Sequence, residues 1–447
     1  MAIIGPQVVT PDPLKFDPSR TGTYERAAAF GLSHVLYAKS PGGVTATAKR
    51  TIRFRPLVER TVRGSGLDAD VLESIVLLES AGRPDAIAGG DPANAAGLTQ
   101  IVAETATNFL GMRVDLVRTR RLTRLIADAR RTGEETELQR LLALRRRVDT
   151  RFDPREALGA TVRYLEFAYR RFGRYDLAVV SYHMGIGNLT QVLRAYAGDA
   201  MTPVRGLIKE RNLSWARLYF DSSPRRHREA WLRLSALGDD SQTYYWRVLA
   251  AREIIRLYRR DPVALDRLTH LHGRGPTAEQ VLHPPKITQR FAASEDLSDA
   301  LRRGSLRRLP NDPRRLHFRV ATRGAVGGDP AVYRAVRPET LRLLRYLAAH
   351  VRDLSGAKMA LTVTRAAYDE TYGRRLTAAG ANASHQPVHE AGYAIDIRRR
   401  YESGAQAAAF QYTLERLSTL GLIAWSRDEA VIHITVGAQA GSLRVSR

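Results

Sequence analysis

The chain has 447 residues, of which 44% are hydrophobic and 26% charged, a composition typical of folded globular proteins and a length that suits two domains. It contains no cysteine, which excludes disulfides, thiolate metal sites and a cysteine nucleophile, so any metal site must use His, Asp and Glu. The formal net charge of +24 favours a polyanionic partner, although solvated basic faces without a partner would also account for it.

The N-terminal sequence MAIIGPQVVTPDPLKF has no basic segment followed by an apolar run, and it therefore does not resemble a signal peptide. No apolar stretch approaches the roughly 20 residues needed to cross a bilayer. We expect no membrane span. The basic residues occur in short clusters along the whole chain and not in one tail, for example at 118–121, 145–147 and 398–400.

Residues 1–50 contain several Pro and Gly and no clear period, which predicts an N-terminal extension. Between residues 51 and 260, apolar residues recur at helical spacing on one face, as from Leu158 to Phe172 and from Tyr244 to Tyr258. Within this part, residues 113–151 form a strongly charged helical stretch typical of an insertion. We expect an all-α domain over 51–260.

Residues 261–313 are rich in proline and are predicted to be a linker with short helices. The pattern changes after this linker. Strands are predicted at 316–320, 359–364, 393–397 and 430–436, and helices at 338–354 and 405–420. This alternation predicts an α+β domain over 314–447.

Glu79 is the first candidate catalytic residue. It ends a predicted helix that Asp68 or Asp70 can cap, and it follows the apolar pair Leu77 and Leu78. Desolvation at such a position raises the pKa of a carboxyl group, which a general acid near neutral pH requires. On its own context alone, an ordinary surface glutamate near a helix end is the better interpretation.

Further segments follow the Glu79-Ser80 pair in a fixed order. They are Ala96-Gly-Leu-Thr-Gln-Ile101, Thr105-Ala106, Ser181-Tyr-His-Met-Gly-Ile-Gly187 and Thr243-Tyr-Tyr245. Over about residues 60–260 this order resembles the soluble lytic transglycosylases and goose-type lysozymes. The resemblance implies a lysozyme-like fold in which Glu79 is the catalytic acid/base, while Gln100 and Tyr182 line the sugar groove. Tyr182 would orient Glu79 or the reacting sugar.

The chain departs from this family at a few positions. Thr99 replaces the usual Met, Ala103 stands where Pro is common, and His183 replaces Asn. The arginine-rich insertion is also unusual. These departures bear on the preference among sugar subsites more than on the chemistry.

The number of carboxylates separates two reaction types. Hydrolytic glycosidases usually need two carboxylates, and no second one has a context comparable to that of Glu79, because Asp85 and Asp91 lie in a Gly-rich loop. The lytic transglycosylase route needs one, which protonates the leaving oxygen and then deprotonates the C6 hydroxyl of the same muramic acid. We favour this route, with its 1,6-anhydro product, and hydrolysis stays open.

A second constellation joins His389, Asp396 and His433. Asp396 lies in the middle of an apolar predicted strand, where a carboxylate is costly unless it is paired or bound to a metal. His433 lies among β-branched residues of a later strand. Two His and one Asp with an open fourth position form a catalytic zinc arrangement. A core histidine and a capped aspartate are the plainer alternative.

The spacing His389-x-x-Gly-x-Ala-x-Asp396, followed by His433 on a late strand, resembles the zinc D-Ala-D-Ala carboxypeptidases and the related L-Ala-D-Glu endopeptidases, a group that shares a hedgehog-like fold. The resemblance covers about residues 315–440. It implies zinc bound by His389, Asp396 and His433. It also implies that Arg365 helps to hold the peptide carboxylate.

The second constellation departs from this family at the position of the catalytic base. The family commonly places a Glu or Asp three residues before the last His, where this chain has Ala430. Glu429 would share a face with His433 in an ideal strand, so it is our candidate for the general base, with Asp428 nearby. His385 is an alternative ligand or base, and a binding-only domain is an alternative to a peptidase.

Taken together, these patterns predict a bifunctional enzyme that degrades peptidoglycan. One domain would cleave the MurNAc–GlcNAc bond, and the other would act on stem peptides as a carboxypeptidase or an endopeptidase with zinc. Its partners would be glycan strands, stem peptides and anionic wall polymers, in the envelope, secreted or on a phage. The alternatives are a wall-binding or scaffolding protein with degenerate sites and, on charge alone, a nucleic-acid binder, although the chain carries no specific nucleic-acid recognition motif.

Overall fold

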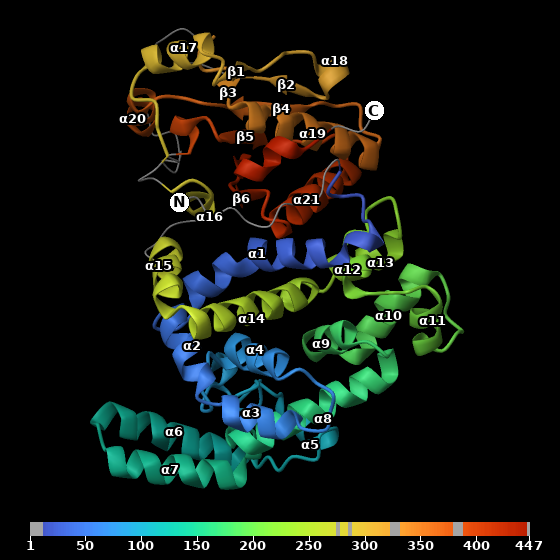
Figure 1. The fold of residues 1–447 in the computed structure, drawn as a ribbon, viewed down its shortest axis with the longest axis vertical. Helices are drawn as coiled ribbons and strands as arrows, with labels where there is room; N and C mark the ends of the chain where they lie inside the picture. Colours follow the sequence, from blue (N-terminus) through green and yellow to red (C-terminus); the bar gives the residue numbers. More distant parts are fainter. Residues whose placement is uncertain (1–11, 274–277, 285–287, 322–330, 379–387, 445–447) are drawn as a thin grey trace.

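The computed structural model describes residues 12–273, 278–284, 288–321, 331–378 and 388–444. The chain is mostly helical, and a small mixed sheet lies in its C-terminal part (Figure 1). This agrees with an all-α part followed by an α+β part. Among the described residues, no helix combines the length and the apolar character that crossing a membrane requires.

The N-terminal part is built from helices of six to nineteen residues. They are α1 (Thr21–Lys39), α2 (Val44–Ile52), α3 (Arg55–Val62), α4 (Ala69–Ser80), α5 (Ala103–Asn108), α6 (Leu116–Thr132), α7 (Glu135–Val148), α8 (Pro154–Phe172), α9 (Tyr175–Met184), α10 (Ile186–Ala197), α11 (Val204–Glu210), α12 (Trp215–Phe220), α13 (Arg228–Ser235) and α14 (Tyr244–Arg260). Helix α14 packs against α1 and α4, so it lies at the centre of this part (Figure 1).

The segment 1–50, in which the sequence shows no clear period, contains helix α1 and most of α2. Helix α1 packs against α14 on one side and α21 on another. Its buried residues include Tyr24 and the consecutive Ala27, Ala28 and Ala29. Because it is covered on more than one face, it shows no single apolar stripe, which is the signal that predicts a surface helix.

Helix α4 is held in place by ion pairs along the turns that precede Glu79. Asp68 caps its N-terminus by accepting a hydrogen bond from the backbone N–H of Asp70. The buried carboxylate of Glu73 pairs with Arg55 of α3 at 3.0 Å and with Arg259 of α14. The three helices are therefore tied together less than two turns before Glu79.

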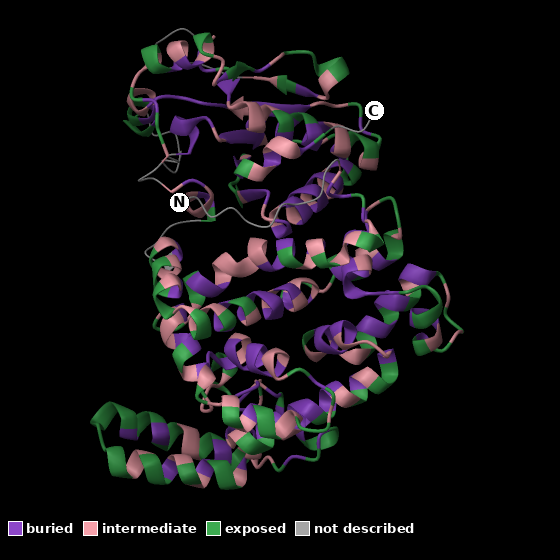
Figure 2. Cartoon of the chain, in the orientation of Figure 1, coloured by how far each residue is buried: buried purple, intermediate pink, exposed green. Residues whose placement is uncertain are grey.

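The charged stretch at 113–151 forms the hairpin of α6 and α7, which extends away from the rest of the helical part (Figure 1). Its surface is largely exposed (Figure 2). A small cluster of its own, formed by Ile126, Ala129 and Leu141, holds the two helices together. The expectation of a helical, charged segment is confirmed.

The linker contains α15 (Pro262–Gly273), α16 (Ala278–Leu282) and α17 (Ser294–Arg302). Short helices were expected there. Helix α16 packs against strands β6 and β7 of the sheet (Figure 1). The segment 261–313, called the connector below, is therefore packed on the folded domain through α16.

The C-terminal part contains a five-stranded sheet in the order β2-β4-β5-β7-β6, in which only the β2–β4 pair is parallel. The elements of the C-terminal part are α18 (Pro313–Leu316), β2 (Phe318–Val320), α19 (Pro338–Ser355), β4 (Leu361–Arg365), α20 (Glu370–Ala378), β5 (Ala394–Arg398), α21 (Gly404–Thr419), β6 (Ile423–Arg427) and β7 (Val431–Val436). Outside this sheet, β1 (Arg307–Arg308) pairs with β3 (Ala335–Val336) in a separate antiparallel pair.

Most of the expected strands and helices of this part occur within two residues of their predicted bounds. The segment 316–320 is only partly a strand, because α18 continues to Leu316. Strand β6 was not expected. Its five residues directly follow α21 and the turn at Gly421, and so short a run shows no clear period.

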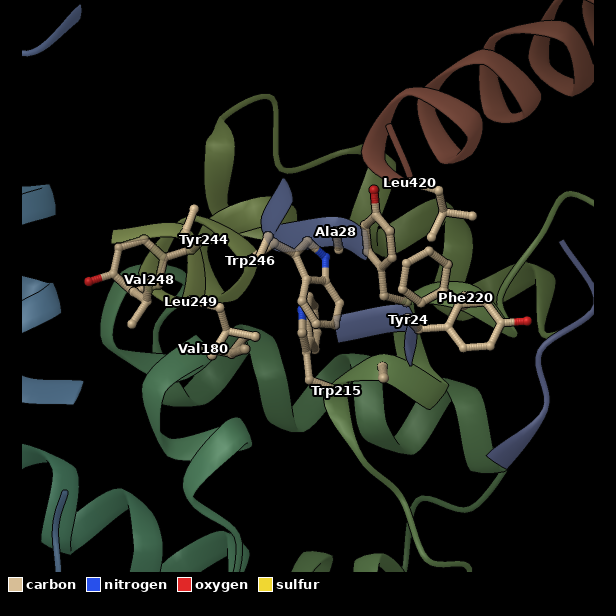
Figure 3. Packing of buried hydrophobic residues seen from close by; sticks show 14 of the residues in the cluster. Tyr24, Ala28, Val180, Trp215, Phe220, Tyr244, Trp246, Val248, Leu249 and Leu420 are labelled. Carbon is tan, nitrogen blue, oxygen red and sulfur yellow. The ribbon is translucent and has the colours of Figure 1, made fainter. Parts of the chain in front are cut away.

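The two parts share one hydrophobic core. Tyr24 of α1 packs on Phe220 with ring centroids 4.9 Å apart, and Phe220 packs on Trp246 at 5.6 Å. Figure 3 shows Leu420, just beyond the end of α21, beside this cluster. The buried guanidinium of Arg416 on α21 lies 3.6 Å over the ring of Tyr219. The sequence shows a helical pattern followed by an α+β pattern, but one hydrophobic cluster contains residues from both parts.

Gly31 allows α1 to approach the end of α21 closely. A Cβ atom at Gly31 would overlap the carbonyl oxygen of Thr419 and lie 2.6 Å from the nitrogen of Gly421. Both obstacles are backbone atoms, so they cannot yield by a side-chain rotation. The absence of a side chain at Gly31 therefore sets the distance between the two parts.

We predict that Gly31→Ala lowers the free energy of unfolding by about 1–3 kcal/mol, because the added methyl group forces the helices apart. The control is Gly22→Ala on the same helix, where the new Cβ meets only the flexible end of Arg26 at 3.4 Å. Urea unfolding of both variants tests this. Equal stability of the two variants would contradict the close approach.

Candidate functional site

Glu79 lies in the last turn of α4, beside the negative end of the helix dipole. The helix ends at Ser80, and Ala81 adopts a left-handed conformation with φ of 55°. Arg50 donates a hydrogen bond from Nε to the carbonyl oxygen of Ala81 at 3.0 Å and so fixes the chain where it leaves the helix. A carboxylate at a helix C-terminus is disfavoured, which adds to the effect of burial on its pKa.

The Glu79 carboxyl group accepts a hydrogen bond from Tyr244 and has a pKa near neutrality. Tyr244, at the start of α14, donates its hydroxyl to Glu79 Oε1 at 2.7 Å. Burial raises the pKa of Glu79 to about 7, and the Tyr244 hydrogen bond and the charge of Arg247 only partly oppose this rise. At neutral pH this carboxyl group can therefore both give and accept a proton.

Tyr182 lies near Glu79, but its hydroxyl bonds to other residues. Its hydroxyl donates to the carbonyl oxygen of Thr99 at 2.7 Å and lies 3.2 Å from the hydroxyl of Thr161. Burial and then the charge of Glu79 raise the pKa of Tyr182 well above its usual value. The structure thus gives the orienting hydrogen bond to Tyr244, and a role for Tyr182 toward a sugar stays a prediction.

Tyr244 is itself held by His183, the residue that replaces the family's Asn. The two rings stack with centroids 4.9 Å apart. The other anchor of His183 is Ser241, whose hydroxyl lies 2.8 Å from Nδ1. The sequence analysis placed Tyr244 in the last motif but gave it no role. Tyr244 is 165 positions from Glu79, so no local sequence pattern could indicate that the two residues are in contact.

Gln100 belongs to a tight turn that begins at Gly97. Gln100 has a φ of 53°, and its side-chain amide donates to the carbonyl oxygens of Ala86 at 3.2 Å and Gly97 at 2.8 Å. At Gly97, where φ is 81°, a Cβ atom would overlap the carbonyl oxygen of Arg151. The amide nitrogen of Gln100 therefore stabilises the turn, and a contact of this side chain with sugar stays a prediction.

Arg151 fixes the loop that carries this turn, a role that the sequence did not indicate. Its guanidinium is buried against Asp149 at 2.7 Å. It donates to the carbonyl oxygens of Pro92, Asn94 and Ile101 at 2.7–3.1 Å. A buried arginine that satisfies three carbonyl groups makes the loop rigid.

The two other carboxylates of this loop are engaged by the hairpin. Asp85 pairs with Arg130, and Asp91 pairs with Arg120 at 3.0 Å. Both pKa values lie below the usual value. At Asp85, burial opposes the shift, but the hydrogen bond and charge of Arg130, with smaller contributions from a backbone hydrogen bond and the charge of Arg145, together outweigh it. At Asp91, the bond from Arg120 is the main cause. Neither group has the raised pKa that Glu79 has.

The second candidate site is built across three neighbouring strands. Arg365 of β4 lies opposite Asp396 of β5, which lies opposite His433 of β7. His389 comes from the short 3-10 turn just before β5. The ligand atoms of His389, Asp396 and His433 lie within 4.8 Å of one another, and all three residues are buried.

The side chains at this site are connected through Asp396. Its Oδ1 lies 3.0 Å from Nε2 of His389 and 2.7 Å from Nδ1 of His433, and its Oδ2 lies 3.1 Å from Arg365. Nδ1 of His389 lies 2.8 Å from the carbonyl oxygen of Ala366, to which it can only donate. In the neutral ring, the lone pair of His389 Nε2 then faces the cluster.

The charges at this site follow from these contacts. Burial would raise the pKa of Asp396, but His389 and the bond from His433 hold it well below the usual range. Burial lowers the pKa of His389. Burial also acts against a charge on His433, yet its bonds to Asp396 and Glu279 raise its pKa to about 9.

The donor set fits zinc. Two imidazole nitrogens and one carboxylate oxygen converge in a buried position, which is the chemistry of catalytic zinc sites that keep an open fourth position. The tautomer of His389 is already fixed by Ala366, as is usual for zinc-bound histidines. Arg365, expected to hold a peptide carboxylate, here pairs with Asp396.

Glu429 lies outside the strand on which its predicted role depended. Strand β7 begins at Val431, and Glu429 is exposed in the turn before it. The argument that Glu429 and His433 share a strand face is therefore wrong, and its role as general base stays a prediction without that support. His385, the alternative ligand or base, lies outside the described residues.

Besides Asp396, a second carboxylate contacts His433: that of Glu279, from the connector helix α16. Its Oε1 lies 3.2 Å from Nε2 of His433. Sequence reasoning missed it, because Glu279 is 154 positions away in a segment interpreted as a linker, with no motif around it.

Neither the protein-family models nor the curated proteins give a match to this chain. The interpretation of both sites therefore rests on the order of the motifs and on the geometry described above.

We predict that Glu79→Gln stabilises the folded chain at alkaline pH. Because the folded pKa of Glu79, about 7, is above the usual 4.5, ionising this carboxyl group weakens folding. Relative to Glu79→Gln, the wild type loses up to about 3 kcal/mol as pH rises from about 4.5 through 7. Urea unfolding at pH 4.5 and pH 8 measures this difference.

The matched control is Glu253→Gln on α14, whose carboxylate is exposed. It is expected to leave the pH dependence of unfolding unchanged. A difference between wild type and Glu79→Gln that stays constant with pH would show that the pKa of Glu79 is not raised.

Proposed function

We propose that this chain is a bifunctional enzyme that degrades peptidoglycan, with a lytic transglycosylase centre at Glu79 and a zinc-dependent stem-peptide peptidase centre at His389, Asp396 and His433. The observation that carries the proposal is the half-buried Glu79, whose carboxyl group has a pKa of about 7 and accepts a hydrogen bond from Tyr244. The order of the motifs between Glu79 and Tyr244 supports a lysozyme-like fold for this part.

The chemistry at Glu79 needs one group that changes its protonation state. The protonated carboxyl group donates to the glycosidic oxygen as the bond to the leaving sugar breaks. The resulting carboxylate then takes the proton from the C6 hydroxyl of the muramic acid, whose oxygen attacks C1 and closes the 1,6-anhydro ring. Tyr244 stabilises the carboxylate between these two steps.

The pairing of the neighbouring acidic residues supports this route over hydrolysis. Asp85 and Asp91 are each bound to an arginine of the hairpin. A second carboxylate that activates water would have to be available on the far side of the bond. Asp85 and Asp91 do not meet this requirement, because each carboxylate is already paired with an arginine.

The second activity rests on the buried cluster of His389, Asp396 and His433. These residues would hold zinc, which when bound supplies a Lewis acid that polarises the scissile carbonyl group. Arg365 lies at the edge of the cluster, on the outer oxygen of Asp396, and from there it can orient a carboxylate-bearing stem peptide. The hedgehog-like fold is part of this proposal.

The charge of the chain supports a wall polymer as partner. The net charge is +24, and the hairpin of α6 and α7 carries many of its arginines on exposed faces (Figure 2). Peptidoglycan stem peptides and the phosphate polymers attached to walls are polyanions. Such a partner places the enzyme at the cell envelope, in the secreted fraction or on a phage particle.

We predict that Glu79→Gln lowers the release of anhydro-muropeptides from purified peptidoglycan by about 100-fold or more, while Glu253→Gln does not. Since Glu79 must be protonated in the first step, the rate with the wild type should fall as pH rises above about 7. Mass spectrometry of the products measures both effects. Reducing ends in place of anhydro ends would contradict the transglycosylase route.

We predict that a zinc chelator abolishes stem-peptide cleavage by the full chain and that added zinc restores it. Anhydro-sugar release in the same digest is the internal control, because Glu79 needs no metal. Peptide cuts that persist after chelation would argue against a zinc peptidase. If no peptide cuts occur with zinc present, the C-terminal part has a binding role.

A further inference from the structure

Helix α16 of the connector is docked against the candidate metal centre. It packs on β6 and β7. At its end, Nε2 of His283 lies 2.6 Å from the carbonyl oxygen of Val436, and the His283 ring stacks on Tyr393 with centroids 4.0 Å apart. These contacts fix the helix next to the strands that carry Asp396 and His433.

Glu279 extends from this helix to His433 and is buried there, with 4% of its surface exposed. Its Oε1 lies 3.2 Å from Nε2 of His433. Among the described residues, its Oε2 has no hydrogen-bond partner. A buried carboxylate with so few partners is costly to folding, so it calls for an explanation other than stability.

The two nitrogens of His433 face different neighbours. Nδ1 faces Asp396 at 2.7 Å, on the side where Nε2 of His389 also converges. Nε2 faces Glu279, with the hydroxyl of Thr435 at 3.3 Å. A neutral ring that carries its hydrogen on Nε2 has its lone pair on Nδ1, directed at the cluster.

We propose that Glu279 is the positioning residue of the zinc centre: its carboxylate accepts a hydrogen bond from Nε2–H of His433, which fixes the ring and directs the Nδ1 lone pair at the metal. This inference rests on the proposed zinc site. It assigns Glu279 the part that carboxylates commonly play behind zinc-bound histidines. Because Glu279 contacts the nitrogen that faces away from the cluster, it is neither a fourth ligand nor the base that Ala430 leaves missing.

The proposal also makes the connector a component of the centre. The three ligands come from residues 389–433, but the group that orients one of them comes from residue 279, before the first strand of the sheet. A chain that begins at the predicted boundary of 314 would keep every ligand and lose this carboxylate.

The test measures zinc binding by the full-length chain, using competition with a fluorescent zinc chelator. We expect Glu279→Gln and Glu279→Ala to weaken zinc binding about 10- to 100-fold. The control is Glu295→Gln, an exposed carboxylate on α17 of the same connector, which should bind zinc as the wild type does. Glu279→Gln keeps the side-chain volume, and thermal unfolding without zinc checks that each variant folds.

Cobalt(II) provides a second readout that a purely structural role would not change. With cobalt in place of zinc, Glu279→Gln should alter the visible absorption bands of the metal, and Glu279→Asp should restore part of the affinity. Zinc affinity equal to that of the wild type in folded Glu279 variants would overturn this inference and leave the zinc centre standing. Tighter binding would overturn it too, since Glu279 would then obstruct the centre. A wild type that binds no zinc would instead overturn the proposed peptidase.

Discussion

The contact between α1 and the end of α21 sets how the two parts of the molecule fit together. At Gly31 the backbones of the two helices approach to a distance that excludes any side chain, and the shared aromatic core continues on both sides of this point. The positions of α14, and through it of α4 and Glu79, depend on the same packing, because α1 covers α14. The first candidate centre is thus supported by a helix that contacts both parts.

The two candidate centres use burial of a carboxyl group in opposite ways. Glu79 has a neutral phenol as its hydrogen-bond donor, so desolvation dominates and its pKa rises. Asp396 is more fully buried than Glu79, but it touches two imidazoles and the guanidinium of Arg365, so it stays ionised. The first arrangement suits a group that exchanges a proton, and the second suits one that holds a cation.

Local signals made most helices and most strands predictable, whereas the resemblance to the zinc peptidases was needed to join His389, Asp396 and His433 into one cluster. The place of Glu79 at a helix end follows from a capped apolar helix, and the places of Asp396 and His433 on strands follow from short apolar, β-branched runs, patterns that extend over a few residues. Tyr244 and Glu279, and Arg151 through its bonds to backbone carbonyl groups, act on groups between 50 and 165 positions away, and a local sequence pattern cannot indicate such contacts. Helix α1 was missed for a related reason, since a helix covered on more than one face loses the stripe that reveals it.

The order of the elements along the chain differs from their order in space. Helix α1 comes first in the sequence but covers α21 near the end, and the connector that divides the two patterns is docked on the sheet. A protease that cut the chain within the connector would leave two fragments that still bury much of their apolar surface against each other. Such fragments would remain associated and would behave as a nicked form of one protein, so the visible sequence boundary is a poor guide to where the molecule can be divided.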